Sequence, residues 1–210
     1  MNKLAKPYLV GITGGSACGK TRFIKELGNL FSNEDISFLS QDNYYKPAEH
    51  HTRDINGHIN YDLPTCLDLD AFKTDILKLC NHEIVRRREY LFQHNEQFGK
   101  WIEIFPAPII IVEGLFVFYE KEIVERFDQK IFIDVDEEIR LQRRIKRDTT
   151  DRNVSEEFVI YQWKNHVKPA FEKYLLPHKE KADMVLNNDE NFNNSLKQME
   201  DHFRMILKLP

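Results

Sequence analysis

The sequence predicts an α/β domain in which a parallel sheet carries helices on both faces. Short aliphatic runs recur along the chain without alternation, which is typical of strands buried on both sides. Segments of helical periodicity separate these runs, as in folds built from alternating strands and helices. The 210 residues, 41% hydrophobic and 30% charged, suit a single globular domain spanning residues 1–210.

Four aliphatic runs are expected to be strands, because each ends in polar or glycine residues. They lie at residues 8–12, 36–39, 108–112 and 130–134. The first runs into a glycine turn, after which Phe23, Leu27 and Phe31 recur at helical spacing. Further helices are expected at about 67–80, 121–127, 136–148, 155–175 and 191–207.

Two segments interrupt this alternation. Residues 43–65 are polar and have no clear period, and a loop of this length inside a compact domain is usually functional or disordered. Residues 81–105 contain two strand-like stretches, which predict a small β insertion.

Composition limits the partners and the compartment. Thirty Lys and Arg against 34 Asp and Glu give a net charge of -4, so the chain lacks the overall basic field expected of a protein that binds nucleic acid or anionic membrane. The three cysteines form no CxxC pair, which argues against a disulfide framework and a structural zinc site. Without an apolar leader or a membrane-length run, we expect a cytoplasmic protein.

The strongest local signal is the run from Gly14 to Thr21, which has the spacing GxxxxGK followed by Ser or Thr. Such a loop points backbone N–H groups at a phosphate, and the following helix adds its positive dipole end. Lys20 is expected to reach the β and γ phosphates and Thr21 to bind magnesium. The loop residues expected to hold the nucleotide are Gly14, Gly15, Ser16, Ala17, Cys18, Gly19, Lys20 and Thr21.

The phosphate loop alone does not choose among kinases, GTPases and motor ATPases, and a glycine-rich turn with an exposed lysine is the alternative to all three. The nearest match to the base-reading motif of GTPases begins with Phe72, and the Ser-Gly-Gly signature of transporter ATPases is absent. Cys18 lies just before a helix N-terminus, where a thiol is more acidic, so it is either a redox-sensitive thiol or simply a small residue that fits a tight loop.

Further motifs occur in a fixed order: Ser40 to Tyr45, Asn60 to Pro64, Glu113-Gly114, Arg140 to Asp148 and Val167 to Phe171. Together with the phosphate loop they closely resemble the uridine (uridine–cytidine) kinase family, within the broader phosphoribulokinase-like group. The resemblance runs from about Leu9 to Leu186. It implies a P-loop NTPase fold with a five-stranded parallel sheet, an arginine-bearing lid at about 144–156, and phosphorylation of a nucleoside 5′-hydroxyl by ATP (or GTP) with Mg²⁺.

The resemblance places Asp42 at the family's catalytic carboxylate and Glu113 at its second acidic position, near magnesium. Asp42 follows a predicted strand, at the sheet edge where open α/β folds bind ligands. A carboxylate there can orient an acceptor hydroxyl and take its proton. Alternatively, Asp42 caps a turn and Glu113 is a solvated loop carboxylate.

On the acceptor side, the resemblance assigns Asp62 to the ribose hydroxyls, Tyr45 and Tyr90 to the nucleoside pocket, and Gln162 to a substrate contact. Each has an ordinary alternative, because tyrosines also serve in cores and a glutamine on a helix is often solvated.

Five arginines lie close together, four of them at helical spacing from Arg140 to Arg147 and the fifth at Arg152. Such a face repels itself unless it meets anions, and arginine suits phosphoryl transfer because its planar fork grips phosphate oxygens. We expect Arg144, Arg147 and Arg152 to be lid contacts and Arg140 and Arg143 to be structural.

The chain departs from the family where the base is read. Leu63 replaces a His, Val154 replaces an Arg, the Tyr90-Leu91-Phe92 stretch lacks an Asp, and His94 falls one position early. The leading hypothesis is conversion of uridine (or cytidine) to UMP (or CMP). A kinase for another ribose-containing metabolite such as nicotinamide riboside, and a nucleotide-binding regulator without turnover, stay open. The resemblance also implies a homo-oligomer.

Overall fold

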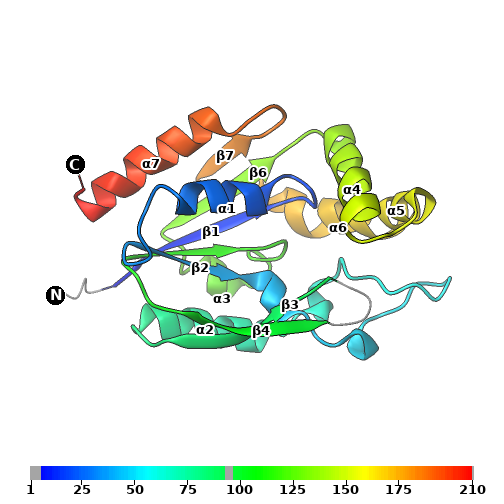
Figure 1. The fold of residues 1–210 in the computed structure, drawn as a ribbon, viewed down its shortest axis with the longest axis horizontal. Coiled ribbons are helices and arrows are strands. Elements are labelled where there is room, and N and C mark those ends of the chain that lie inside the picture. The colour runs from blue at the N-terminus through cyan, green and yellow to red at the C-terminus, as the bar shows by residue number, and fades with distance from the viewer. Residues whose placement is uncertain (1–5, 93–96, 210) are drawn as a thin grey trace.

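The computed structural model describes residues 6–92 and 97–209. Its centre is a sheet of five parallel strands in the order β2-β5-β1-β6-β7 (Figure 1). The strands are β1 (Tyr8–Gly14), β2 (Ile36–Ser40), β5 (Ile109–Glu113), β6 (Gln129–Asp134) and β7 (Met184–Asn187). The expected α/β fold with a five-stranded parallel sheet is therefore confirmed.

The register brings the strand ends that carry the sequence motifs to one edge. Glu113 at the end of β5 lies opposite Ile12 of β1 on one side and Ser40 of β2 on the other. The residues that follow these strands, including the glycine turn after Gly14 and the segment from Gln41, consequently begin side by side. This edge is where ligands bind in open α/β sheets.

Helices cover both faces of the sheet (Figure 1). On one face, α1 (Lys20–Gly28) and α7 (Asn193–Leu207) bury aromatic side chains such as Phe23 and Phe203. On the other, α2 (Leu69–Cys80) and the short α3 (Lys121–Val124) pack their apolar sides. Fully burying one such side chain contributes roughly 1.5–3 kcal/mol, so both faces of the sheet contribute to stability.

Side-chain caps fix where several helices begin. Asp68 accepts a hydrogen bond from the N–H of Ala71 at 3.0 Å and so starts α2, two residues later than the apolar period suggested. Asp136 caps α4 (Glu137–Asp151), and Ser155 caps α5 (Glu156–Gln162). The turn between α4 and α5 belongs to the lid region expected at about 144–156.

The structure does not have the single regular α-helix that was expected over residues 155–175. After α5 the chain makes a π-helical turn at Trp163–Val167, one α-helical turn as α6 (Lys168–Ala170), and a second π-helical turn at Phe171–Leu175. Pro169 has no N–H to donate to the carbonyl four residues earlier, which accounts for the change of hydrogen-bonding pattern around it. A 3-10 turn at Leu176–His178 then leads to β7.

The two exceptional segments are ordered by short elements. Strands β3 (Val85–Tyr90) and β4 (Phe98–Ile104) pair antiparallel as the predicted β insertion. The polar segment after β2 contains 3-10 turns at Gln41–Tyr44, Ala48–His50 and Pro64–Cys66. Among the described residues, no helix is long and apolar enough to cross a membrane.

Candidate active site

One cavity of about 590 Å³ opens at the carboxyl edge of the sheet and gathers most of the residues expected at the site. The phosphate loop and α1 form one end, the arginines of α4 form the side, and the segment after β2 and the hairpin form the other end. Those of the expected site residues that line it are Ser16, Ala17, Gly19, Lys20, Thr21, Asp42, Tyr45, Asp62, Tyr90, Glu113, Arg144, Arg147, Arg152 and Gln162. Of the expected loop residues, Gly14, Gly15 and Cys18 lie behind this surface.

The phosphate loop depends on two backbone conformations that most residues avoid. Ala17 has φ 61° and Gly19 has φ 95°. A Cβ at Gly19 would lie 2.6 Å from the amide nitrogen of Asn188, so the close packing also requires glycine there. Asn188 holds the loop by donating a hydrogen bond to the carbonyl of Cys18 at 2.8 Å. The sequence reasoning missed this residue, which directly follows β7.

Within the loop, the Lys20 ammonium donates to the carbonyl of Gly14 at 2.7 Å, so its charge lies over the glycine turn. The Cys18 side chain, in contrast, is fully buried in the core against α1 and α7. This burial favours the alternative, a small residue that fits a tight loop, because a reagent can reach the sulfur only if the loop opens.

Two carboxylates face the cavity from adjacent strands. Asp42 lies in the 3-10 turn after β2, and Glu113 is the last residue of β5 and 8% exposed. Burial and then the charge of Asp42 raise the pKa of Glu113 to about 7, although a hydrogen bond from Ser40 and the charge of Lys20 oppose the rise. Burial also raises the pKa of Asp42, against Lys20, Arg152 and Arg147. One of the pair is thus suited to hold a cation and the other to take a proton.

A buried carboxylate gathers the lid arginines. Asp148, 2% exposed, accepts from Nε of Arg147 at 2.7 Å and pairs with Nε of Arg144 at 3.3 Å and Nη1 of Arg152 at 3.4 Å. Burial raises the pKa of Asp148, but the hydrogen bond from Arg147 and the three positive charges outweigh it and lower the pKa overall. The sequence reasoning named Asp148 only as the end of a motif.

These arginines reach both halves of the cavity. Arg144 donates to the hydroxyl of Ser16 in the phosphate loop at 2.9 Å. The guanidinium of Arg152 lies over the ring of Phe92, 4.7 Å from its centroid. The lid residues therefore contact the phosphate loop through Arg144 and the aromatic end of the cavity through Arg152.

Arg140 and Arg143 hold the backbone, as expected of structural residues. Arg140 is 4% exposed, donates to the carbonyl of Val135 at 3.1 Å and stacks on Phe171. Arg143 donates to the carbonyls of Asn188 and Asp189, at 2.9 Å each, and also borders the cavity.

The end of the cavity away from the phosphate loop is lined by aromatic rings. The rings of Tyr45 and Tyr90 lie 5.2 Å apart, and Phe92 packs edge-on against both. The hydroxyl of Tyr45 donates to the carbonyl of Tyr61 at 3.1 Å. Such rings accept a flat ligand without demanding a particular pattern of polar groups.

Asp62 is the exception to this apolar surface. It is 8% exposed, and among residues 6–92 and 97–209 its carboxylate has no hydrogen-bond or ion-pair partner, although it borders the cavity. Its oxygens reach the cavity without a partner among these residues and are therefore free to accept hydrogen bonds from a ligand.

Tyr61 and Gln97 are among the lining residues that were not predicted. Both border the same end, and the Gln97 amide oxygen accepts from the N–H of Ala48 at 3.2 Å. Gln97 has no sequence signal, because its place depends on how the hairpin meets the segment after β2. His94, expected near the base, lies outside the described residues.

Residues 9–192 match the Phosphoribulokinase / Uridine kinase family. A uridine kinase from Chlamydia pneumoniae is 35% identical over 180 residues, covering 85% of this chain and 81% of that protein. A uridine kinase from Lactobacillus helveticus is 34% identical over 187 residues, covering 89% of each. The fold is similar to that of phosphoribulokinase from Rhodobacter spheroides, with a TM-score of 0.65 at 16% identity over 87% of this chain and 70% of that one.

The raised pKa of Glu113 predicts a pH-dependent stability. Folding raises this pKa from 4.5 to about 7, so the folded protein binds the proton more tightly than the unfolded chain does. The stability gained is complete below about pH 4.5 and is lost as the pH rises through 7. Glu113→Gln should therefore stabilise the protein more at pH 8 than at pH 5, by roughly 1–3 kcal/mol.

Urea unfolding of the ligand-free protein at the two pH values measures this difference, with the exposed Glu180→Gln as control. If Glu113→Gln changes the free energy of unfolding equally at pH 5 and pH 8, the pKa of the Glu113 carboxyl group is not raised in the folded protein.

Proposed function

Because the chain belongs to the phosphoribulokinase / uridine kinase family, we propose that it transfers the terminal phosphoryl group of a nucleotide to the 5′-hydroxyl of a ribonucleoside, most simply uridine (or cytidine). One observation carries this proposal. A single cavity holds the phosphate loop at one end and the buried, unpartnered carboxylate of Asp62 among aromatic rings at the other, with Asp42 also on its wall.

The donor end fits a nucleoside triphosphate. The loop offers backbone N–H groups, and Lys20 and Arg144 add positive charge beside it. The residues suited to magnesium are Thr21 and Glu113, whose oxygens border the same cavity and are of the kind this ion prefers. When bound there, magnesium would supply positive charge that offsets the negative charge developing during transfer. ATP or GTP fits this end equally, because no base-reading motif was found.

Asp42 is the group suited to activate the acceptor. It orients the 5′-hydroxyl and takes its proton as the oxygen bonds to the γ-phosphorus and the bond to the β,γ-bridging oxygen breaks. The nucleoside diphosphate then leaves with the electron pair of that bond. Arg147 and Arg152, whose charges act on Asp42, lie where they can stabilise the transferred group.

The acceptor end fits a ribonucleoside. Asp62 can accept hydrogen bonds from the two vicinal hydroxyls of ribose, and Gln162 lines the same cavity. The rings of Tyr45, Tyr90 and Phe92 can stack on a base.

A second candidate acceptor is another ribose-containing metabolite, such as nicotinamide riboside, which would use the same ribose contacts. Val154 lines the cavity and cannot hydrogen-bond to a base, which favours a tolerant pocket, whereas Leu63 packs against the core and does not line it. The guanidinium of Arg152 over the Phe92 ring opposes this acceptor, because a cationic base would meet a positive charge there. A regulator without turnover is disfavoured by the joint presence of Lys20 and Asp42 on one cavity wall.

The proposed role of Asp42 predicts a split between catalysis and nucleotide binding. Asp42→Asn keeps the shape but cannot take a proton, so kcat should fall by about 10²–10⁴ while the affinity for MgATP changes little. Steady-state rates with uridine and calorimetry with MgATP measure the two effects. The exposed Asp70→Asn serves as control. A parallel loss of nucleotide affinity would instead assign Asp42 to the metal or to the fold.

The proposed role of Asp62 predicts selectivity for ribose. An acceptor without the 2′-hydroxyl leaves part of a buried carboxylate unpaired, which lowers kcat/KM by roughly 10–150-fold. Asp62→Ala should remove this discrimination. The measurement is kcat/KM for uridine, cytidine, their 2′-deoxy forms and nicotinamide riboside. Equal values for uridine and 2′-deoxyuridine would place the sugar elsewhere, and no turnover of any nucleoside would overturn the proposed acceptor class.

A further inference from the structure

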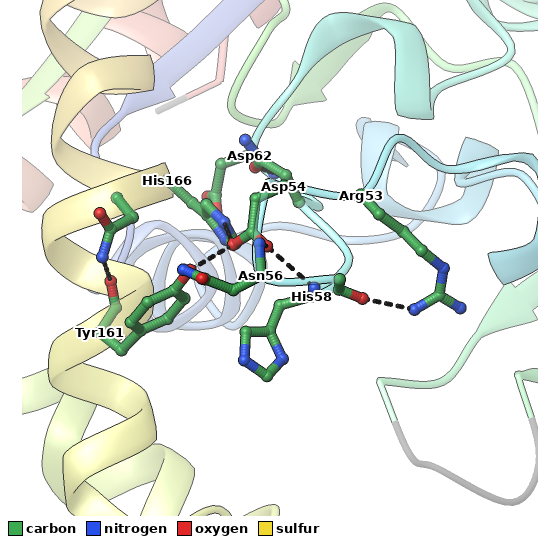
Figure 2. A network of polar contacts seen from close by, with 10 residues as sticks. Arg53, Asp54, Asn56, His58, Asp62, Tyr161 and His166 are labelled. Carbon is green, nitrogen blue, oxygen red and sulfur yellow. Dashed lines mark hydrogen bonds and ion pairs between the residues drawn. The ribbon is translucent and has the colours of Figure 1, made fainter.

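A cluster of polar contacts outside the cavity joins the loop of residues 52–62 to α5 and the π-helical turn after it (Figure 2). The carboxylate of Asp54 accepts from the hydroxyl of Tyr161 at 2.6 Å and from Nε2 of His166 at 2.8 Å. Asn56 donates from its side chain to the Tyr161 hydroxyl at 2.7 Å. The ring of His58 packs edge-on against Tyr161 and Phe158.

On the loop side of the cluster, hydrogen bonds within the loop hold Asp54 in place. Asp54 also accepts from the backbone N–H groups of Asn56 and His58, at 2.9 Å each. These bonds shape a tight turn that ends at Gly57, whose φ is 84°. The hydrogen bond from Tyr161, together with those from His58, His166 and Asn56, keeps the pKa of Asp54 well below its ordinary value, so the acceptor in the cluster is a carboxylate.

The π-helical turn is what brings both donors to Asp54. Tyr161 and His166 are five residues apart, and in an α-helix only residues three or four apart share a face. A π-helical turn pairs residues five apart, and here the two rings lie 5.9 Å from each other. His166 is 3% exposed, and among the described residues the loop carboxylate of Asp54 is the one polar partner of its side chain.

Both sides of the cluster carry residues of the acceptor pocket. Ile59, Tyr61 and Asp62 follow Asp54 on the loop, and Gln162 directly follows Tyr161 on α5. The loop has little apolar burial of its own to hold it, since Ile55 at its tip is 99% exposed. Its position relative to α5 therefore depends on the Asp54 contacts and on the packing of the His58 ring against Phe158 and Tyr161.

We propose that Asp54, Tyr161 and His166 form a latch that holds the 52–62 loop against α5 and so positions Asp62 and Gln162 around the acceptor sugar. The proposal rests on the acceptor site described under the proposed function. The three are positioning residues, since none of them borders the cavity. Loss of the latch weakens acceptor binding and leaves the phosphate loop and the donor site as they are.

The test separates the acceptor from the donor. Asp54→Asn and Tyr161→Phe should each raise the KM for uridine about 5- to 30-fold, with kcat and the KM for MgATP within about twofold of the unchanged protein. In the double variant the KM for uridine should rise by less than the product of the two single increases, because both changes break the same contact. Glu137→Gln is the matched control, because it removes a carboxylate that pairs with Lys168 near the same helix but contacts no part of the loop.

Replacement of His166 distinguishes a latch from simple packing. Gln keeps an N–H donor and should retain most of the uridine affinity, whereas Leu fills the buried space without a donor and should raise the KM for uridine like Asp54→Asn. If Leu is tolerated better than Gln, or if kcat and both KM values change together in every variant, the cluster serves general stability and the proposal is overturned.

A second readout is independent of turnover. In the protein without substrates, Asp54→Asn should increase the rate of amide hydrogen exchange in residues 52–60 about tenfold, with exchange in α1 unchanged. If no nucleoside is phosphorylated by the unchanged protein, the proposed function fails and this readout alone decides on the latch. Unchanged exchange in residues 52–60 overturns the latch whether or not the protein is a nucleoside kinase.

Discussion

Three guanidinium groups can converge on one cleft only where an anion offsets their mutual repulsion, and in this chain the anion is the buried carboxylate of Asp148. Arg147 binds it most closely, and Arg144 and Arg152 complete the cluster. The cluster aims positive charge at the same cavity that receives the phosphate loop. Arg147, which meets Asp148 through Nε, keeps its terminal N–H groups for phosphate oxygens without the entropy cost of ordering a long side chain at binding.

The acidic wall of the cavity balances this charge. Asp42 and Glu113 come from neighbouring parallel strands whose ends share a register, so their proximity follows from the sheet itself. Burial, and then repulsion by the charge of Asp42, raise the pKa of Glu113 to about 7. A divalent cation with a triphosphate would relieve that repulsion on one side, and the arginines of α4 would face the triphosphate on the other.

Much of this arrangement was predictable because it depends on local sequence. The GxxxxGK spacing identifies the loop that precedes α1, and aliphatic runs identify four of the five strands. The fifth, β7, is a short Met-Val-Leu stretch that the residues alone did not separate from its surroundings. The resemblance supplied the candidates Asp42 and Asp62, which the fold brings to one cavity.

The parts that sequence reasoning missed depend on contacts between distant segments. Asn188 supports the phosphate loop across 170 positions, and Asp54 meets His166 across 112. The π-helical turn that makes the second contact arises where Pro169 disturbs an otherwise regular helical pattern, which periodicity cannot register. Asp148 sits in a charged run that looks solvated until the fold buries it.

In the proposed function, one cavity binds a ribonucleoside with its 5′-hydroxyl next to the terminal phosphate of a nucleotide. A crystal structure of the protein with uridine, a non-hydrolysable ATP analogue and magnesium tests it most directly. The account predicts triphosphate on the loop from Gly14 to Thr21, the ribose hydroxyls on Asp62, and the 5′-oxygen about 2.6–3.2 Å from a carboxylate oxygen of Asp42. Uridine bound with its 5′-oxygen turned away from Asp42, or bound outside this cavity, would contradict it.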